Sequence, residues 1–174
     1  MTADVVFSRL VKVEALPRDG LTQKIEATPA ERVALAADND LADIAKLTAE
    51  FVIKRSGKGV RVVGTVHAEV SQTCVVSLDP FPVTIDESID VRFAQEARDR
   101  PGRAEPEVVA LDAEDAPDPI VDGKVDLGAL AAEFMALALD PYPRKPGVEF
   151  APPPEEAPDP SPFDALGKIA KKKV

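Results

Sequence analysis

Residues 60–71 alternate between two kinds of side chain, and this alternation constrains the fold more than any other feature of the sequence. A period of two is typical of a β-strand with one buried and one exposed face. Ser56-Gly57-Lys58-Gly59 reads as a turn, and residues 48–55 before it favour a strand. We therefore predict a long hairpin formed by residues 48–55 and 60–71. One face of its second strand carries small and apolar residues: Val60, Val62, Gly64, Val66, Ala68 and Val70.

Other strands are predicted on both sides of the hairpin. β-Branched residues predict strands at residues 5–14 and 83–93, whereas residues 41–47 fit either a helix or a strand. Leu78-Asp79-Pro80-Phe81-Pro82 is predicted to be a turn, because two prolines cannot continue a central strand.

Two helix starts complete the folded part. Thr28-Pro29-Ala30-Glu31 has the spacing of a capping box with proline at the first helical position, which predicts a helix that ends near Ala37. Asp126 can cap a second helix, over residues 126–139. We therefore predict a single α+β domain over residues 1–148, with a mostly antiparallel β-sheet and two packed helices. The second helix carries an apolar face formed by Leu127, Leu130, Phe134 and Leu137.

The net charge of −10 is concentrated in two proline-rich stretches. Proline combined with like charges cannot bury enough surface to offset the loss of chain entropy. We therefore predict a flexible, disordered acidic insert at residues 95–118, with Val108–Leu111 as a candidate short strand, and a Pro/Glu-rich linker at residues 149–161. The rest of the chain is close to neutral.

Residues 162–174 predict a short amphipathic helix that ends in three lysines. A helix this short is marginal in water, so it needs a surface to dock on, either this domain or a partner. Its candidate partner-binding residues share one face: Phe163, Leu166 and Ile169.

The sequence offers little material for catalysis or for a cofactor. It holds one Cys and one His, and no nucleophile elbow, phosphate loop or dinucleotide fingerprint occurs. Cys74 is interpreted as a small buried residue, His67 as solvated or locally hydrogen-bonded, and Glu133 as structural, although a reactive thiol and an acid–base role are the alternatives for Cys74 and Glu133. We predict no enzyme, no metal site and no cofactor.

Basic residues around the hairpin turn are the sharpest candidate site. Four bases fall between Lys54 and Arg61, and no acid occurs between Phe51 and Ala68. Such a cluster can converge on RNA phosphates, although an ordinary charged hairpin tip is the alternative interpretation. A second basic pair follows the second helix. The candidate RNA-binding residues are Lys54, Arg55, Lys58, Arg61, Arg144 and Lys145.

Four stretches stand in a recognisable order: GVRVVGTVHAEV, QTCVVSLDPFPVTIDESIDVRF, VDLGALAAEFMALALDPYPRKPG and SPFDALGKIAKK. With these stretches the chain resembles the YceD family, named for large ribosomal RNA subunit accumulation, in its alphaproteobacterial form. The resemblance rests on the Cys74 turn, the Asp126-Leu127-Gly128 helix start with Glu133, and Pro162-Phe163. It implies a bacterial cytoplasmic protein needed for normal levels of large-subunit ribosomal RNA, without catalytic residues.

The turn at Cys74 departs from the pattern of many relatives, which carry C-x-x-C there and have been suggested to bind metal. Here Ser77 occupies the second position. A structural zinc site needs about four nitrogen or sulfur ligands, and this chain has one Cys and one His. The metal suggestion therefore does not extend to this sequence.

Two functions remain open. The first is a ribosome-biogenesis factor that contacts large-subunit ribosomal RNA through the basic hairpin. The second is an adaptor that binds a basic ribosomal protein through its acidic loop and its C-terminal helix. We predict no DNA partner and no membrane partner, since no apolar run approaches the roughly 20 residues of a membrane span. The N-terminus lacks the basic and apolar regions of a secretion signal, which favours the cytoplasm. The sequence leaves the oligomeric state open.

Overall fold

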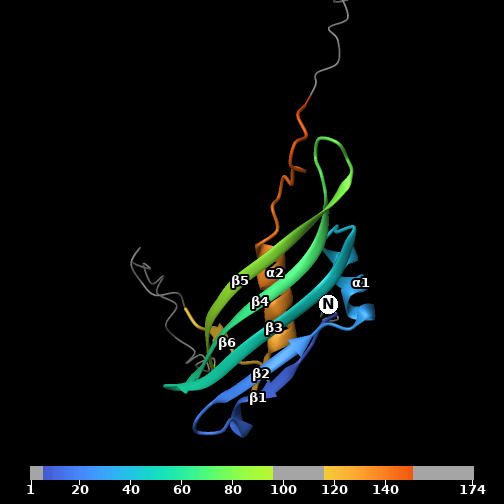
Figure 1. The fold of residues 1–174 in the computed structure, drawn as a ribbon. Coiled ribbons are helices and arrows are strands. Elements are labelled where there is room, and N and C mark those ends of the chain that lie inside the picture. Colours follow the sequence, from blue (N-terminus) through green and yellow to red (C-terminus); the bar gives the residue numbers. More distant parts are fainter. Residues whose placement is uncertain (1–5, 96–115, 151–174) are drawn as a thin grey trace, which may run out of the picture.

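A five-stranded sheet with the order β2-β3-β4-β5-β6 forms the body of the protein. The computed structural model describes residues 6–95 and 116–150 (Figure 1). Neighbouring strands of the sheet are antiparallel except for β5 and β6, which are parallel, and β1 and β7 pair separately. The elements are β1 (Leu10–Lys12), a 3₁₀ helix (Val13–Ala15), β2 (Leu21–Glu26), α1 (Pro29–Asp38), β3 (Asp43–Ser56), β4 (Gly59–Thr73), β5 (Pro80–Ala94), β6 (Asp118–Pro119), β7 (Lys124–Asp126) and α2 (Leu127–Leu137).

The predicted hairpin is confirmed as β3 and β4, which pair from Asp43–Ser71 to Ser56–Gly59. Gly57 opens the two-residue connection with a φ of 56°, a conformation that favours glycine. Every second residue of β4 is buried from Val60 to Gln72, apart from the half-buried Gly64, so the predicted alternation is present.

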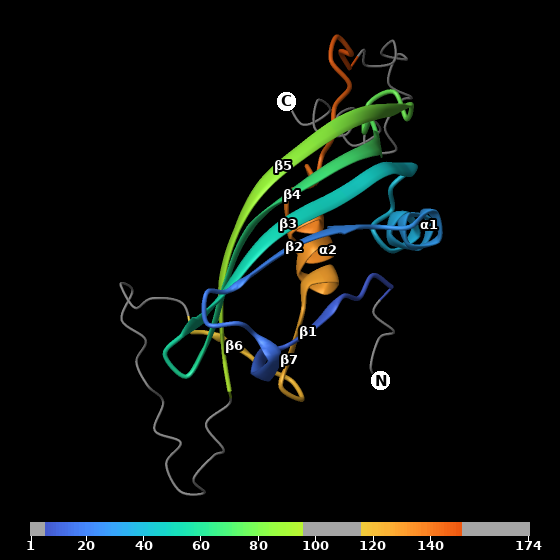
Figure 2. The same ribbon diagram turned by 60° about the horizontal axis from the view of Figure 1, so that its bottom comes forward.

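Helix α2 covers one face of the arched sheet, which we call the inner face (Figure 2). The core lies between them, and its largest fully buried side chains include Phe7, Phe51, Leu127 and Met135. The predicted apolar face of α2 is only partly buried, because Leu137 is 73% exposed near the end of the helix. The opposite, outer face of the sheet is not covered by any element within residues 6–95 and 116–150 (Figure 2).

The structure corrects two strand predictions and adds two strand segments that the sequence left open or did not predict. The expected strand at residues 5–14 is limited to β1 and followed by a 3₁₀ helix. Residues 43–47 belong to β3, and β2 was not predicted because its burial pattern leaves Ile25 as its one fully buried residue. Strand β5 begins at Pro80, inside the expected turn, because prolines are tolerated where the sheet has an open edge. The candidate strand at Val108–Leu111 lies outside the described residues.

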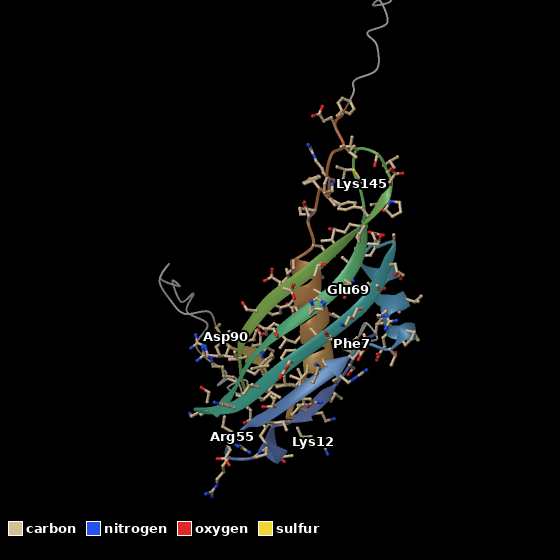
Figure 3. All side chains as sticks on the ribbon, in the orientation of Figure 1. Phe7, Lys12, Arg55, Glu69, Asp90 and Lys145 are labelled. Carbon is tan, nitrogen blue, oxygen red and sulfur yellow. The ribbon has the colours of Figure 1, made fainter. Side chains whose placement is uncertain are left out.

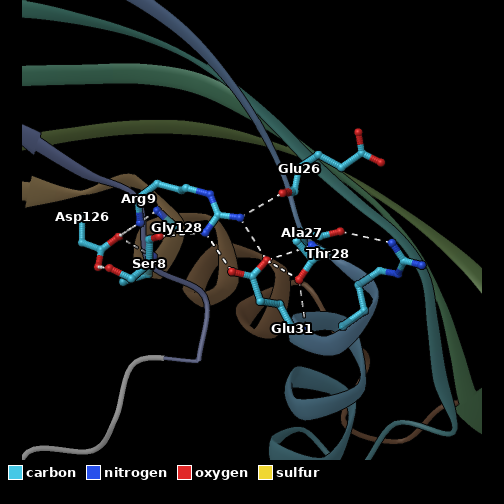
Figure 4. A network of polar contacts seen from close by, with 10 residues as sticks. Ser8, Arg9, Glu26, Ala27, Thr28, Glu31, Asp126 and Gly128 are labelled. Atoms are coloured by element: carbon cyan, nitrogen blue, oxygen red, sulfur yellow. Dashed lines mark hydrogen bonds and ion pairs between the residues drawn. The ribbon is translucent and has the colours of Figure 1, made fainter.

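Both predicted helix caps are present, and a polar network joins them (Figure 4). Thr28 and Glu31 form the capping box of α1, while the Asp126 carboxylate accepts bonds from the first turn of α2. Asp126 also accepts hydrogen bonds from the Ser8 hydroxyl and the Arg9 backbone N–H. Arg9 in turn donates two guanidinium bonds to Glu31, at 2.8 and 3.0 Å. The N-terminal segment is thereby attached to the starts of both helices.

The Arg9 guanidinium and the Thr28 N–H lower the pKa of Glu31 to about 2 from its usual 4.5. A lowered pKa stabilises the fold above pH 4.5, and this stabilisation is lost as the pH falls from 4.5 toward 2. We expect Glu31→Gln to reduce the free energy of unfolding at pH 7 by about 1 kcal/mol. The difference from the unmodified protein should shrink across that acidic range in urea titrations. Glu14→Gln, at an exposed position, is the control, and an equal loss there would contradict the assignment.

Candidate functional site

Three basic side chains lie side by side across the outer face of the sheet. Lys54 on β3 is paired in register with Arg61 on β4, and Arg61 is paired with Arg92 on β5. Directly opposed residues have Cβ atoms about 5 Å apart, so the three cations form one continuous row. We call Lys54, Arg61 and Arg92 the basic row, and the exposed Lys58 lies at the turn beside it.

The charges of the basic row are partly compensated. The Asp90 carboxylate accepts two hydrogen bonds from the Arg61 guanidinium, one of them 2.7 Å long at Nε, and this arginine lowers the pKa of Asp90. Beside the row, Val52 and Val63 line a hollow of about 380 Å³ together with Lys54 and Arg61. The surface therefore combines cations with a small apolar patch.

The structure divides the predicted RNA-binding residues among three places. Lys54, Lys58 and Arg61 come together at or beside the basic row. Arg55 is the residue after Lys54 on β3, so it lies on the opposite face of the sheet. Its guanidinium donates hydrogen bonds to the backbone carbonyls of Val13, Glu14 and Leu16, at 3.1 to 3.2 Å. Figure 3 places Lys145 at the far end of the sheet from Arg55. The second basic pair, Arg144 and Lys145, is therefore a separate surface.

Arg92 was missed by the sequence analysis. The signal was present, because the predicted strand 83–93 gives Arg92 the parity opposite to Ile89 and Val91. What the sequence lacked was the pairing of β4 with β5, which sets Arg92 directly opposite Arg61.

Cys74 joins two loops at that far end of the sheet. Its buried sulfur accepts hydrogen bonds from the backbone N–H groups of Val76, Ser77 and Lys145, at 3.3 to 3.5 Å. These hydrogen bonds lower the pKa of the thiol to about 6, and the bonds from Ser77 and Lys145 have the largest effect. Burial of the thiol acts in the opposite direction and raises its pKa. A second link between the loops is the bond from Val75 N–H to the Pro143 carbonyl. The expectation of a small buried residue is confirmed, with a hydrogen-bonding role added.

We expect Cys74→Val to lower the melting temperature by roughly 5 °C, because three N–H donors lose their acceptor. Cys74→Ser retains an acceptor at this position and should lose less. Thermal unfolding followed by circular dichroism measures both variants. Equal losses in the two would show that the bonds to sulfur contribute nothing to stability.

His67 lies on the outer face of β4 between two carboxylates. Its Nδ1 is 2.7 Å from Asp86 Oδ1, and its Nε2 is 3.5 Å from Glu69 Oε1. The pKa of His67 is raised above the usual 6.5, and the hydrogen bond to Asp86 is the main cause. The expected local hydrogen bonding of this histidine is therefore confirmed.

A proton NMR titration can follow His67 alone, because the chain has one histidine. We expect its pKa to lie above 6.5 and to fall in Asp86→Asn, with Asp43→Asn as the control at another exposed position. The stabilisation from protonated His67 is complete below pH 6.5 and is lost as the pH rises through the folded-state pKa. An unchanged pKa in Asp86→Asn would contradict the assignment.

Within residues 6–95 and 116–150, no group of three or more His, Cys, Asp or Glu side chains has an arrangement that could hold a metal ion. The Cys74 turn does not fit zinc either, because Ser77 replaces the second thiol and backbone N–H groups surround the sulfur. Glu133 is exposed on α2. Phe163, Leu166 and Ile169 lie outside the described residues. In the described part of the chain, no helix has the length and apolarity to cross a membrane.

Fold and site together define a small α+β protein with a basic surface on an open sheet face. The chain belongs to the YceD family: the family model described as large ribosomal RNA subunit accumulation protein YceD matches residues 62–169, more than half of the sequence. The predicted resemblance is confirmed, and the match includes the Cys74 turn, α2 and the C-terminal residues up to Ile169. No curated protein and no solved structure showed significant similarity.

Proposed function

We propose that this protein supports the accumulation of large-subunit ribosomal RNA by binding RNA directly through the basic row. The family description supplies the role in accumulation. The observation that carries the contact is the cross-strand register of Lys54, Arg61 and Arg92. Like charges placed directly opposite each other destabilise a sheet, and Asp90 already offsets part of this repulsion through its bonds to Arg61. Phosphate groups would offset this repulsion.

The composition of the surface favours backbone contacts over base recognition. Lys54, Arg61 and Arg92 are all exposed to some degree, and the apolar side chains that line the neighbouring hollow are valines, which cannot stack on bases as aromatic rings do. Contacts to phosphates recognise the shape of a folded RNA and carry little sequence information. We therefore propose that the protein binds structured RNA, acts without catalysis and works in the cytoplasm.

The adaptor function stays a prediction. The acidic insert and the terminal helix, with Phe163, Leu166 and Ile169, lie outside the described residues. The basic row gives the RNA-binding function an observation of its own, and for this reason we place it first.

The test is RNA binding measured against salt concentration. A fragment of large-subunit ribosomal RNA is titrated with the protein and with the triple variant Lys54→Gln, Lys58→Gln, Arg92→Gln. Removal of one cation that neutralises a phosphate reduces the slope of log K against log salt by about 0.7 to 0.9. We expect the triple variant to show a slope about 2 units smaller and to bind at least tenfold more weakly in moderate salt.

A matched variant removes the same number of charges elsewhere on the sheets: Lys12→Gln, Lys24→Gln, Lys46→Gln. This variant should keep most of the slope of log K against log salt. If both triple variants lose equal affinity, binding reflects overall charge and the basic row is not the site. If neither variant loses affinity, or no RNA binds, the proposed contact is wrong.

A further inference from the structure

Strand β5 is paired along one side and open along most of the other. It is in register with β4 over its whole length, from Pro80 to Ala94. On its second side, β6 pairs with Phe93 and Ala94 alone. Within residues 6–95 and 116–150, no backbone hydrogen bond reaches this second side between Thr84 and Asp90. The edge strand therefore presents an unpaired stretch of backbone groups.

Strand parity shows which residues face the open edge. The Ala94 carbonyl accepts a bond from Ile120 N–H on the β6 side, whereas the Asp79 carbonyl accepts one from Cys74 N–H, in line with the β4 pairing. Residues with the parity of Ala94 thus direct their backbone groups outward. Pro80 and Pro82 also direct their backbone outward. They prevent strand pairing at the start of β5, because proline has no N–H to donate. The open positions below them are Thr84, Asp86, Ser88 and Asp90.

An apolar groove lies beside this edge, and most of the charged residues near the edge are acidic. Between β5 and α2 lies a groove of about 330 Å³, whose apolar lining includes Val91, Leu130, Phe134 and Leu137. Leu137 is 73% exposed in this groove. Five carboxylates lie along the edge and the groove, against one cation in the groove lining, Arg92: Asp86, Glu87, Asp90, Asp118 and Glu133.

We propose that the β5 edge between Thr84 and Asp90 binds an extended, lysine- and arginine-rich segment of a partner protein as an added strand. Main-chain hydrogen bonds would form with the outward backbone groups of β5. Alternate side chains of the segment enter the groove beside Val91 and Phe134, while its basic side chains meet the carboxylates. The partner contacts the backbone edge, so this interaction does not depend on the proposed RNA contact, although Arg92 of the basic row also lines the groove.

The charges near the edge favour a basic peptide segment over an RNA and over a second copy of this chain. The carboxylates at Asp86, Glu87 and Glu133 repel RNA phosphates. A second copy of the chain paired through the same edge would bring Asp86 and Glu87 of one copy close to those of the other, which costs free energy. Strand β6 already uses the lower end of this edge, so the geometry permits pairing.

The probe is a labelled ten-residue peptide of alternating lysine and valine with blocked ends. Binding is measured by fluorescence anisotropy, and its position by amide hydrogen exchange. We expect the amides of Asp86, Ser88 and Asp90 to exchange fast in the free protein and to be protected by the peptide. Two control peptides separate backbone pairing from charge: one is N-methylated at alternate residues, and one has the lysines and valines in two blocks. Both should bind at least tenfold more weakly.

Two protein variants complete the test. Ser88→Pro removes an outward N–H at a position with the parity of Pro80 and Pro82, and it should abolish binding. Glu87→Gln with Glu133→Gln should weaken binding about fivefold, whereas the matched Glu26→Gln with Glu50→Gln should not. If Ser88→Pro does not fold, the N-methylated peptide still tests the backbone contact.

Four results would overturn the proposal. The first is slow exchange at the edge in the free protein, which would mean that the chain itself covers the edge. The second is equal binding of the N-methylated peptide. The third is a loss of affinity in Glu26→Gln with Glu50→Gln as large as that in Glu87→Gln with Glu133→Gln. The fourth is protection of the edge by an RNA oligomer and not by the alternating peptide.

Discussion

The architecture depends on one asymmetry: a sheet with strands of up to 15 residues is covered by α2 on its inner face, and its outer face is open. Burial of the inner face drives folding, because alternate apolar residues of β3, β4 and β5 leave water there. The outer face is then free to carry charge without a cost in buried area. The basic row follows from this asymmetry, and so do Asp86 and Asp90, which lie on the outer face of β5.

Opposite charges lie close together on this open surface. Asp90 pairs with Arg61 of the basic row and also lines the groove beside the β5 edge. His67 and Asp86 form a second pair farther along the same strands, and this pair is charged when His67 is protonated. A partner that engages one surface would therefore change the electrostatic environment of the other, since interactions between exposed charges extend over roughly one Debye length, about 8 Å at physiological salt. At the far end, Cys74 joins two loops through backbone donors.

Local signals in the sequence were sufficient for the hairpin, the capping box at Thr28 and the Asp126 cap, because each depends on residues a few positions apart. They were not sufficient for β2, because this segment becomes part of the sheet through its pairing with β3, which lies far along the chain. The prolines of β5 were misread as a turn, since only the strand order shows that the outer side of this strand is open. The basic row was anticipated in part: Lys54 and Arg61 were among the predicted basic residues, Arg92 was not, and the Arg55 guanidinium donates to backbone carbonyls.

The sequence by itself determined the α+β class, the family, the faces of the central strands and the starts of both helices. These properties follow from side-chain periodicity and from contacts within one turn of the chain. The tertiary structure alone decided which strands are neighbours and hence that Lys54, Arg61 and Arg92 form one row. It also decided which edge of the sheet stays open. The physical reason is that alternation fixes the side of the sheet on which a residue lies, whereas strand neighbours are chosen by burial of the whole inner face against α2.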